Sequence, residues 1–152
     1  MTVWRISNHS TLDGGGGLRA PGRWHTRGQR VVYCAPNPTT ALLEILVHAE
    51  IDFEDLPVTY RYLEIDVPDS VSRELVDPSA LGGAGWGARL EDTRKMGDEW
   101  LHSRRTAMLL VPSAIVPATM NIVLNPAHPA TSGITIARAH LQRMDSRLIG
   151  RR

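Results

Sequence analysis

The sequence contains one cysteine, one lysine and almost no net charge, and these shortages exclude several classes of protein. A single thiol, Cys34, cannot form an intramolecular disulfide or a cysteine-based zinc site, and it is compatible with a reducing compartment. The 17 basic and 16 acidic residues leave a formal net charge of +1, so we expect no bulk attraction to nucleic acid or to an anionic membrane. Of the basic residues only Lys95 is a lysine, and the other 16 are arginines. Such a preference for arginine usually reflects genome composition and decides nothing about function.

Long apolar runs and metal-binding clusters are missing as well. The most apolar stretches are interrupted by Glu44 and His48 or end at Pro112, and residues 1–18 hold no apolar segment of signal-peptide length. The six histidines show no His-x-x-x-His spacing, and the glycine run at 14–17 fits neither a phosphate-binding loop nor a dinucleotide fingerprint. We therefore expect a cytoplasmic protein with no membrane span and no catalytic metal.

The length of 152 residues, 42% of them hydrophobic, is enough for one core and too short for two typical domains, so residues 1–152 are expected to form a single domain. Apolar periodicity and the turn residues between apolar segments predict strands and two helices, with residues 69–87 mostly in loops. The pattern indicates an α+β fold with a small mixed or antiparallel sheet. The expected strands are 3–6, 31–34, 58–66, 106–111 and 121–124, with one or two more within 134–143, and the expected helices are 41–50 and 89–103.

The expected helix at 41–50 is apolar on nearly every side, which is typical of a buried helix. Thr39 or Thr40 is its expected N-cap. Glu44 and His48 interrupt the apolar surface at i and i+4, so they lie on one face. A carboxylate in a core helix is costly unless it is paired or opens on a cleft. Either Glu44 and His48 satisfy each other at the solvent edge of the helix, or Glu44 belongs to a functional cleft.

Arg23 and Tyr33, which precede this helix in the sequence, are candidates for the same cleft. Arg23 lies between Gly22 and Trp24, so a flexible turn presents a guanidinium that suits a phosphate or a carboxylate; the alternative is an exposed arginine beside a core tryptophan. Tyr33 lies on the strand that leads into the helix, where a tyrosine usually serves packing. Spacing alone leaves both roles open.

Two polar residues follow the later strands. Ser113 stands at a break framed by Pro112 and Pro117, but no nucleophile-elbow motif surrounds it. A strand-end serine that donates a hydrogen bond into a pocket is therefore favoured over a nucleophile. Asn125 precedes Pro126, a position where most such residues cap turns.

Eight short motifs run in a fixed order along nearly the whole chain. They are Trp4-Arg5-Ile6, Gly22-Arg23-Trp24, Val31-Val32-Tyr33, Ala41-Leu42-Leu43-Glu44-Ile45-Leu46-Val47-His48, Gly97-Asp98-Glu99-Trp100-Leu101, Val111-Pro112-Ser113-Ala114-Ile115-Val116-Pro117, Asn121-Ile122-Val123-Leu124-Asn125-Pro126 and His128-Pro129. In this order they resemble the RES domain, the toxin half of bacterial Xre-RES toxin–antitoxin systems, which is named for a conserved arginine, glutamate and serine.

The resemblance implies a fold similar to the diphtheria-toxin-like ADP-ribosyltransferases and a reaction that breaks the nicotinamide–ribose bond of NAD+. By position, Arg23, Glu44 and Ser113 would be the trio that gives the family its name, with Tyr33 and His48 in the same cleft. NAD+ would be the substrate. The implied partner is an Xre-type helix-turn-helix antitoxin that covers the cleft.

The residue types suit that reaction. Loss of nicotinamide builds positive charge on the ribose, and a Glu44 carboxylate near the 2′-hydroxyl would stabilise the transition state more than the ground state. Arg23 would hold the pyrophosphate, with Arg5 as a further contact to the dinucleotide, and Tyr33 would pack against nicotinamide or ribose. The residues expected to orient the substrate or assist proton transfer are His48, Ser113 and Asn125.

The chain departs from the family pattern in three places. His25 stands where members commonly have asparagine. The segment 120–122 lacks an acidic residue and an aromatic that are often found there, and residues 130–131 replace an Asp-Phe pair. These departures concern the rim of the pocket and the details of substrate recognition.

Three functions remain open at this point. The first is a toxin that depletes NAD+ by hydrolysis or phosphorolysis. The second is transfer of ADP-ribose to a host protein, and the family includes a member whose target is phosphoribosyl pyrophosphate synthetase. The third is a non-catalytic protein-binding module that leaves NAD+ intact.

Overall fold

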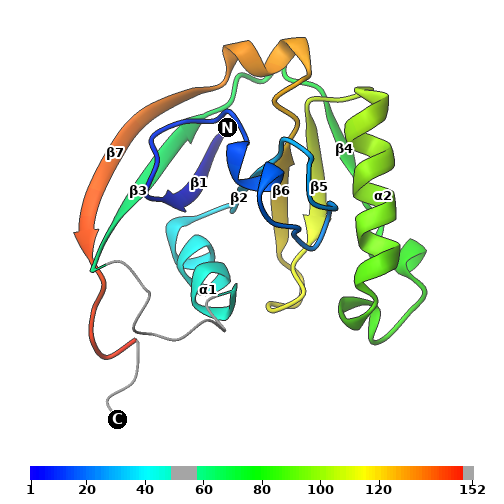
Figure 1. The fold of residues 1–152 in the computed structure, drawn as a ribbon, viewed down its shortest axis with the longest axis horizontal. Helices are drawn as coiled ribbons and strands as arrows, with labels where there is room; N and C mark the ends of the chain where they lie inside the picture. The colour runs from blue at the N-terminus through cyan, green and yellow to red at the C-terminus, as the bar shows by residue number, and fades with distance from the viewer. Residues whose placement is uncertain (49–57, 149–152) are drawn as a thin grey trace.

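Apolar side chains build two β-sheets that face each other; one helix lies along the outer side of one sheet, and the other helix lies between the two sheets (Figure 1). The structure is a computed structural model and describes residues 1–48 and 58–148. Its strands are β1 (Thr2–Ser7), β2 (Val32–Cys34), β3 (Thr59–Asp66), β4 (Arg73–Leu75), β5 (Met108–Pro112), β6 (Met120–Leu124) and β7 (Thr135–Arg143), and its helices are α1 (Pro38–His48) and α2 (Leu90–Ser103). This mixture confirms the expected α+β fold.

The strands form one antiparallel sheet and one mixed sheet. The first has the order β1-β3-β7; the second has the order β2-β6-β5-β4, in which β4 runs parallel to β5 and the other pairs are antiparallel. The sheets meet where Trp4 and Ala35 exchange two main-chain hydrogen bonds, with N···O distances of 2.8 and 2.7 Å. This junction brings β1 beside the strand that leads into α1.

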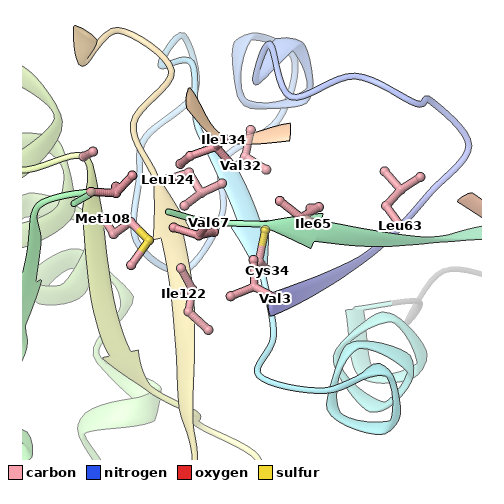
Figure 2. Close-up of a cluster of buried hydrophobic side chains, with 12 residues drawn as sticks. Val3, Val32, Cys34, Leu63, Ile65, Val67, Met108, Ile122, Leu124 and Ile134 are labelled. Atoms are coloured by element: carbon pink, nitrogen blue, oxygen red, sulfur yellow. The ribbon is translucent and has the colours of Figure 1, made fainter. Parts of the chain in front are cut away.

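The main core lies between the two sheets (Figure 2). Val3 and Ile65 from the first sheet and Val32 and Ile122 from the second are each at most 2% exposed. Burial of each such side chain contributes about 1.5–3 kcal/mol relative to exposure. Cys34 lies in the same core, where burial raises the pKa of its thiol to about 12 and keeps it in the unreactive, protonated form.

Helix α2 covers the outer face of the mixed sheet. Its fully buried Trp100 packs with Val111 and Val123 from β5 and β6. Gly97 lets the helix approach the loop before β2, because a Cβ at this position would lie 1.8 Å from the carbonyl oxygen of Trp24. The expected second helix is thus confirmed, and it is tightly packed against that loop.

Helix α1 differs from its expected form in two ways. Its N-cap is Asn37 instead of a threonine: the Asn37 Oδ1 accepts a hydrogen bond from the Thr40 N–H at 2.8 Å, and Pro38 occupies the first helical position. Thr40 and Ala41 are its buried residues, and Val47 is 43% exposed. The expectation of a helix buried on nearly every side is therefore wrong, because α1 packs on the first sheet with one side and faces outward with the other.

The other expected strands lie within a few residues of their expected positions. The expected strand at 58–66 is β3, and its pairing with β7 changes register between Glu64 and Ile65. The tail forms β7, whereas residues 69–87 contain β4 and two 3-10 turns in addition to loops. The last two residues of the expected first helix, 49–50, lie outside the described residues.

Candidate functional site

A cavity of about 340 Å³ opens beside the junction of the two sheets, between β1, β2, α1 and the loop at 16–25. Small-molecule sites usually have volumes of about 300–1,000 Å³. Four of the expected site residues line this cavity: Arg5, Tyr33, Glu44 and His48. The structure therefore brings residues from the first two strands and the first helix to one place, as the sequence predicts.

The Glu44 carboxylate is held by two donors on one of its oxygens. Ser113 Oγ donates to Oε1 at 3.0 Å, and Asn121 Nδ2 donates to the same oxygen at 2.5 Å. In the described part of the chain, Oε2 accepts no hydrogen bond from the protein. The carboxylate is thus oriented through Oε1, and Oε2 is left for a ligand in the cavity.

Ser113 is committed to this orienting contact. Its hydroxyl oxygen accepts hydrogen bonds from the N–H groups of Ile115 and Val116 at 3.2 and 3.1 Å, while its hydroxyl proton points to Glu44. Its own N–H donates to the Thr119 carbonyl at 2.8 Å, which closes the turn after β5. The geometry fits the expected hydrogen-bond donor: among the described residues the hydroxyl has no histidine partner, and its contact with Glu44 orients the carboxylate.

Asn121 is a site residue that the sequence reading did not select. It lies on β6 opposite Val111 and lines the cavity. Its Nδ2 contacts Glu44, whereas its Oδ1 is buried and has no hydrogen-bond partner in the described residues. A buried unpaired acceptor costs about 1–3 kcal/mol, so the amide is held in this orientation by the carboxylate. The sequence feature that could have identified Asn121 as a site residue is its polar side chain within the otherwise apolar strand β6.

The Tyr33 hydroxyl is engaged on both sides. It accepts a hydrogen bond from the Trp24 N–H at 3.0 Å and lies 2.7 Å from Nδ1 of His25. Burial raises the pKa of the Tyr33 phenol, so the hydroxyl keeps its proton. Because the protein uses the hydroxyl, the aromatic ring is the part of Tyr33 that is left to contact a ligand.

Gly22 and helix α2 fix one wall of the cavity. A Cβ at Gly22 would lie 2.7 Å from the Tyr33 hydroxyl, so a larger residue would displace the tyrosine. From α2, Thr93 Oγ1 donates to the Arg23 carbonyl at 2.7 Å, and Arg94 Nε donates to the Gly22 carbonyl at 2.8 Å. The loop is therefore attached to the helix on the side away from the cavity.

Arg5 brings a permanent positive charge to the cavity. One of its Nη groups donates to the Tyr33 carbonyl at 3.0 Å, and its Nε is buried without a hydrogen-bond partner among the described residues. Buried donors of a guanidinium are costly when they stay unpaired. Among the described residues that line the cavity, no other residue is an arginine or a lysine. Arg5 is therefore the residue best placed to attract an anionic group.

His48 lies at the rim and does not contact the Glu44 carboxylate. Its Nδ1 is 3.0 Å from the main-chain carbonyl oxygen of Glu44. A carbonyl can only accept, so Nδ1 carries a proton and a neutral ring has its free lone pair on Nε2. The alternative in which these two side chains satisfy each other is not what the structure shows, since the carboxylate is held by Ser113 and Asn121.

Arg23 is placed outside the lining of the cavity. Its guanidinium donates to the Gly87 carbonyl and lies 6.0 Å from the ring centre of Trp86. Its neighbour Trp24 is 2% exposed and belongs to the core on the outer face of the mixed sheet. A contact between Arg23 and a ligand in the cavity would require the guanidinium to leave Gly87.

Asn125 is also placed away from the cavity. It is 1% exposed, and both ends of its amide serve the fold. Nδ2 donates to the Leu101 carbonyl at 2.9 Å, and Oδ1 accepts from the Ala127 N–H at 3.1 Å. The structure therefore gives Asn125 a turn-forming position and does not bring it beside Glu44.

Other parts of the described chain add little to this site. A second depression, of about 590 Å³, lies near Leu12, Arg30 and His128, and none of the expected site residues lines it. In residues 1–48 and 58–148, no three histidine, cysteine or acidic side chains are grouped to bind a metal ion. No helix in these two segments has the length and apolar character needed to cross a bilayer.

Comparisons with known proteins agree with the motif order. The model of the RES domain family matches residues 2–145. The protein named Toxin Res from Pseudomonas putida is 48% identical over 136 residues, which cover 90% of this chain and 92% of that protein. The Prs ADP-ribosylating toxin from Sphingobium sp. is 37% identical over 158 residues, covering 97% and 96% of the two chains. These matches confirm the resemblance drawn from the motifs.

A solved structure has a similar fold. It is the crystal structure of the M. tuberculosis MbcT-MbcA toxin-antitoxin complex, in which one chain aligns with a TM-score of 0.67 and 18% sequence identity. The alignment covers 93% of this chain and 84% of the other. At that identity the likeness concerns the fold.

Proposed function

This chain belongs to the RES domain family, and we propose that it is a toxin that cleaves the nicotinamide–ribose bond of NAD+ in the cavity beside Glu44. The observation that carries the proposal is the Glu44 carboxylate, which two donors orient through Oε1 while Oε2 remains unpaired by the described residues. A carboxylate fixed in this way is suited to a positive charge that develops in the cavity.

The proposed reaction breaks the bond between C1′ of the ribose and the nicotinamide nitrogen. The electron pair of that bond leaves with neutral nicotinamide, and the ribose gains oxocarbenium character. Oε2 of Glu44 stabilises this charge and accepts a hydrogen bond from the 2′-hydroxyl more strongly in the transition state than in the ground state. An acceptor oxygen or nitrogen then forms the new bond to C1′.

Residues around Glu44 hold the rest of the dinucleotide in this proposal. The ring of Tyr33 packs against nicotinamide or ribose, and Arg5 attracts the pyrophosphate. His48 contributes its Nε2 at the rim. Arg23 and Asn125 lie outside the lining in the conformation described, and Arg23 reaches the pyrophosphate only if it releases Gly87.

The test is nicotinamide release by purified wild type and Glu44→Gln. The substitution keeps the shape of the side chain and removes its charge, so we expect the rate to fall by at least about 100-fold. Glu91→Gln is the matched control, because Glu91 lies exposed in the first turn of α2 and away from the cavity. Equal rates in wild type and Glu44→Gln would overturn the assignment. Intact NAD+ with the wild type would instead favour a non-catalytic binding module.

Transfer of ADP-ribose to a protein is the second candidate. It is favoured by the similarity, over 97% of this chain, to a relative whose name describes ADP-ribosylation of Prs. NAD+ labelled in its adenylate part separates the outcomes in a bacterial lysate. Label on a protein supports transfer, whereas free ADP-ribose or ADP-ribose 1-phosphate with no labelled protein supports hydrolysis or phosphorolysis.

The proposal includes a cytoplasmic location and an Xre-type antitoxin that covers the cavity. Support for the partner comes from the fold, since the structurally similar chain was crystallised in a toxin-antitoxin complex. Co-expression with the product of a neighbouring helix-turn-helix gene should abolish nicotinamide release. Unchanged release in a purified complex of the two proteins would contradict this mode of neutralisation.

A further inference from the structure

We propose that His25 is a positioning residue that holds Tyr33 in the cavity wall while its imidazole is neutral, so that binding of NAD+ weakens when His25 takes up a second proton. The inference rests on the proposed function and adds pH-dependent control of the same site. It starts from the hydrogen bonds of His25, which are independent of any ligand.

The hydrogen-bond partners of His25 fix its tautomer. Nε2 lies 3.0 Å from the Ala20 carbonyl oxygen, which can only accept, so Nε2 carries the proton. Nδ1 of the neutral ring is therefore an acceptor, and the Tyr33 hydroxyl donates to it at 2.7 Å. The same hydroxyl accepts from the Trp24 N–H at 3.0 Å. Every polar atom of the two side chains is then paired.

A second proton on His25 would disrupt this arrangement. Nδ1 would become a donor that faces the Tyr33 hydroxyl, and the tyrosine proton would lose its acceptor. The ring has little room to turn, because it is 3% exposed and a Cβ at Gly22 would lie 2.8 Å from its Cε1 and Nδ1. On the other side, a Cβ at Gly17 would lie 3.1 Å from Nε2. Relief therefore requires Tyr33 or the loop at 20–25 to move.

The groups around His25 favour the neutral form. Burial is the largest influence and lowers its pKa; the charge of Arg94 lowers it further, whereas the Ala20 hydrogen bond and the charge of Asp98 raise it. Arg94 and Asp98 belong to α2, and Tyr33 on β2 keeps its proton because burial raises its own pKa. The net direction is a lowered pKa for His25.

The sign of the pH effect follows from this direction. A histidine whose pKa is lower in the folded than in the unfolded state stabilises the fold above its ordinary pKa of about 6.5. That stabilisation is lost as the pH falls from there through the folded-state pKa. Over the same range the fraction of molecules with Tyr33 in place decreases, and the apparent KM for NAD+ rises in inverse proportion to that fraction.

Two substitutions of His25 by an amide residue distinguish the roles of its two ring nitrogens. Asparagine in His25→Asn places its Oδ1 near the position of Nδ1, so it can accept from Tyr33 and cannot titrate. Glutamine in His25→Gln places its Nε2 near that of histidine and leaves the Tyr33 hydroxyl without its acceptor. His102→Asn is the control, because His102 is an exposed residue on α2 whose recorded partner is Gln29.

The experiment measures KM and kcat for nicotinamide release from NAD+ between pH 7.5 and pH 5, and the free energy of unfolding over the same range. For wild type and His102→Asn we expect KM to rise toward about 10-fold per pH unit at the acid end, as for a single proton, with a smaller change in kcat. His25→Asn should keep the neutral-pH KM and lose the acid rise. His25→Gln should have a raised KM at every pH.

Three results would overturn the proposal. They are an acid rise in KM that persists in His25→Asn, a neutral-pH KM in His25→Gln equal to that of wild type, and an acid effect confined to kcat. The unfolding measurement separates this from failure of the proposed function. If wild type releases no nicotinamide at pH 7.5, the reaction is wrong; if His25→Asn unfolds with the same pH dependence as wild type, the protonation of His25 is wrong.

Discussion

Replacement of Asn121 by leucine tests whether the orientation of Glu44 governs the reaction. The substitution keeps the approximate shape of the side chain and removes the Nδ2 donor that lies 2.5 Å from Glu44 Oε1. A hydrogen bond to a charged group contributes about 1.5–3 kcal/mol, which corresponds to roughly a 10- to 150-fold loss in kcat/KM if it is lost in the transition state. Ser113 still holds the carboxylate in this variant, so the reaction should not be abolished.

The same substitution should have little effect on stability. Leucine also removes Oδ1 of Asn121, a buried acceptor without a partner in the described residues. Removal of an unpaired buried group recovers about 1–3 kcal/mol, which offsets the lost hydrogen bond to Glu44. We therefore expect the free energy of unfolding in urea to change by less than about 1 kcal/mol.

Asn125→Leu is the matched control, with the opposite expected result. It leaves the buried Leu101 carbonyl unpaired, at about 1–3 kcal/mol, and removes the acceptor of the N–H of Ala127, an exposed residue, while Glu44 keeps both of its donors. We expect about 1–3 kcal/mol of lost stability and, for the folded fraction, kcat/KM within about 3-fold of wild type. Wild-type kcat/KM in Asn121→Leu would contradict the role of Asn121 in orienting Glu44, and so would an equal loss of activity per folded molecule in Asn125→Leu and Asn121→Leu.

Two further substitutions test the proposed contact between Arg5 and the pyrophosphate, and the packing of α2. Arg5→Met keeps the length of the side chain and removes its charge, so the KM for NAD+ should rise about 10- to 100-fold, whereas turnover of nicotinamide riboside, which lacks the pyrophosphate, should not change; an equal loss with both substrates would contradict the assignment. Gly97→Ala puts a Cβ 1.8 Å from the Trp24 carbonyl oxygen, so the free energy of unfolding in urea should fall by about 1–3 kcal/mol or more, and a variant as stable as wild type would contradict this packing.

The arrangement of the elements is predictable where the local pattern and the packing agree. The strand at β2 and the helix that follows are marked by β-branched residues, a proline-rich turn and good helix formers, and these features do not depend on distant contacts. The N-cap was harder to predict because Asn37, Thr39 and Thr40 are all suitable cap residues, and the entry of the chain from β2 selects among them. The outward side of α1 was missed because apolar composition does not say how many neighbours a helix has.

The candidate site, too, is predictable from the sequence only in part. Arg5, Tyr33, Glu44 and His48 lie on elements that follow one another in sequence, and the motif order identifies them. Asn121 acts on Glu44 from 77 positions away, so only the strand pairing in the second sheet reveals the contact.

Arg23 and His25 show a further limit. Their neighbours in sequence predict a loop, but not the direction of the side chains. Those directions are fixed by the Gly87 carbonyl, in a short 3-10 turn, and the Ala20 carbonyl, in a loop, and such short connecting segments are hard to predict from sequence.

The junction at Trp4 and Ala35 has a mechanical consequence for this molecule. Each sheet has its own network of hydrogen bonds, and in the described residues this isolated bridge joins the two. The cavity lies beside it, with Arg5 on one sheet and Tyr33 on the other. Arg5 already donates a hydrogen bond across the junction to the Tyr33 carbonyl. A dinucleotide bound there would add further contacts between the two sheets, so that occupancy of the site and rigidity of the fold would increase together.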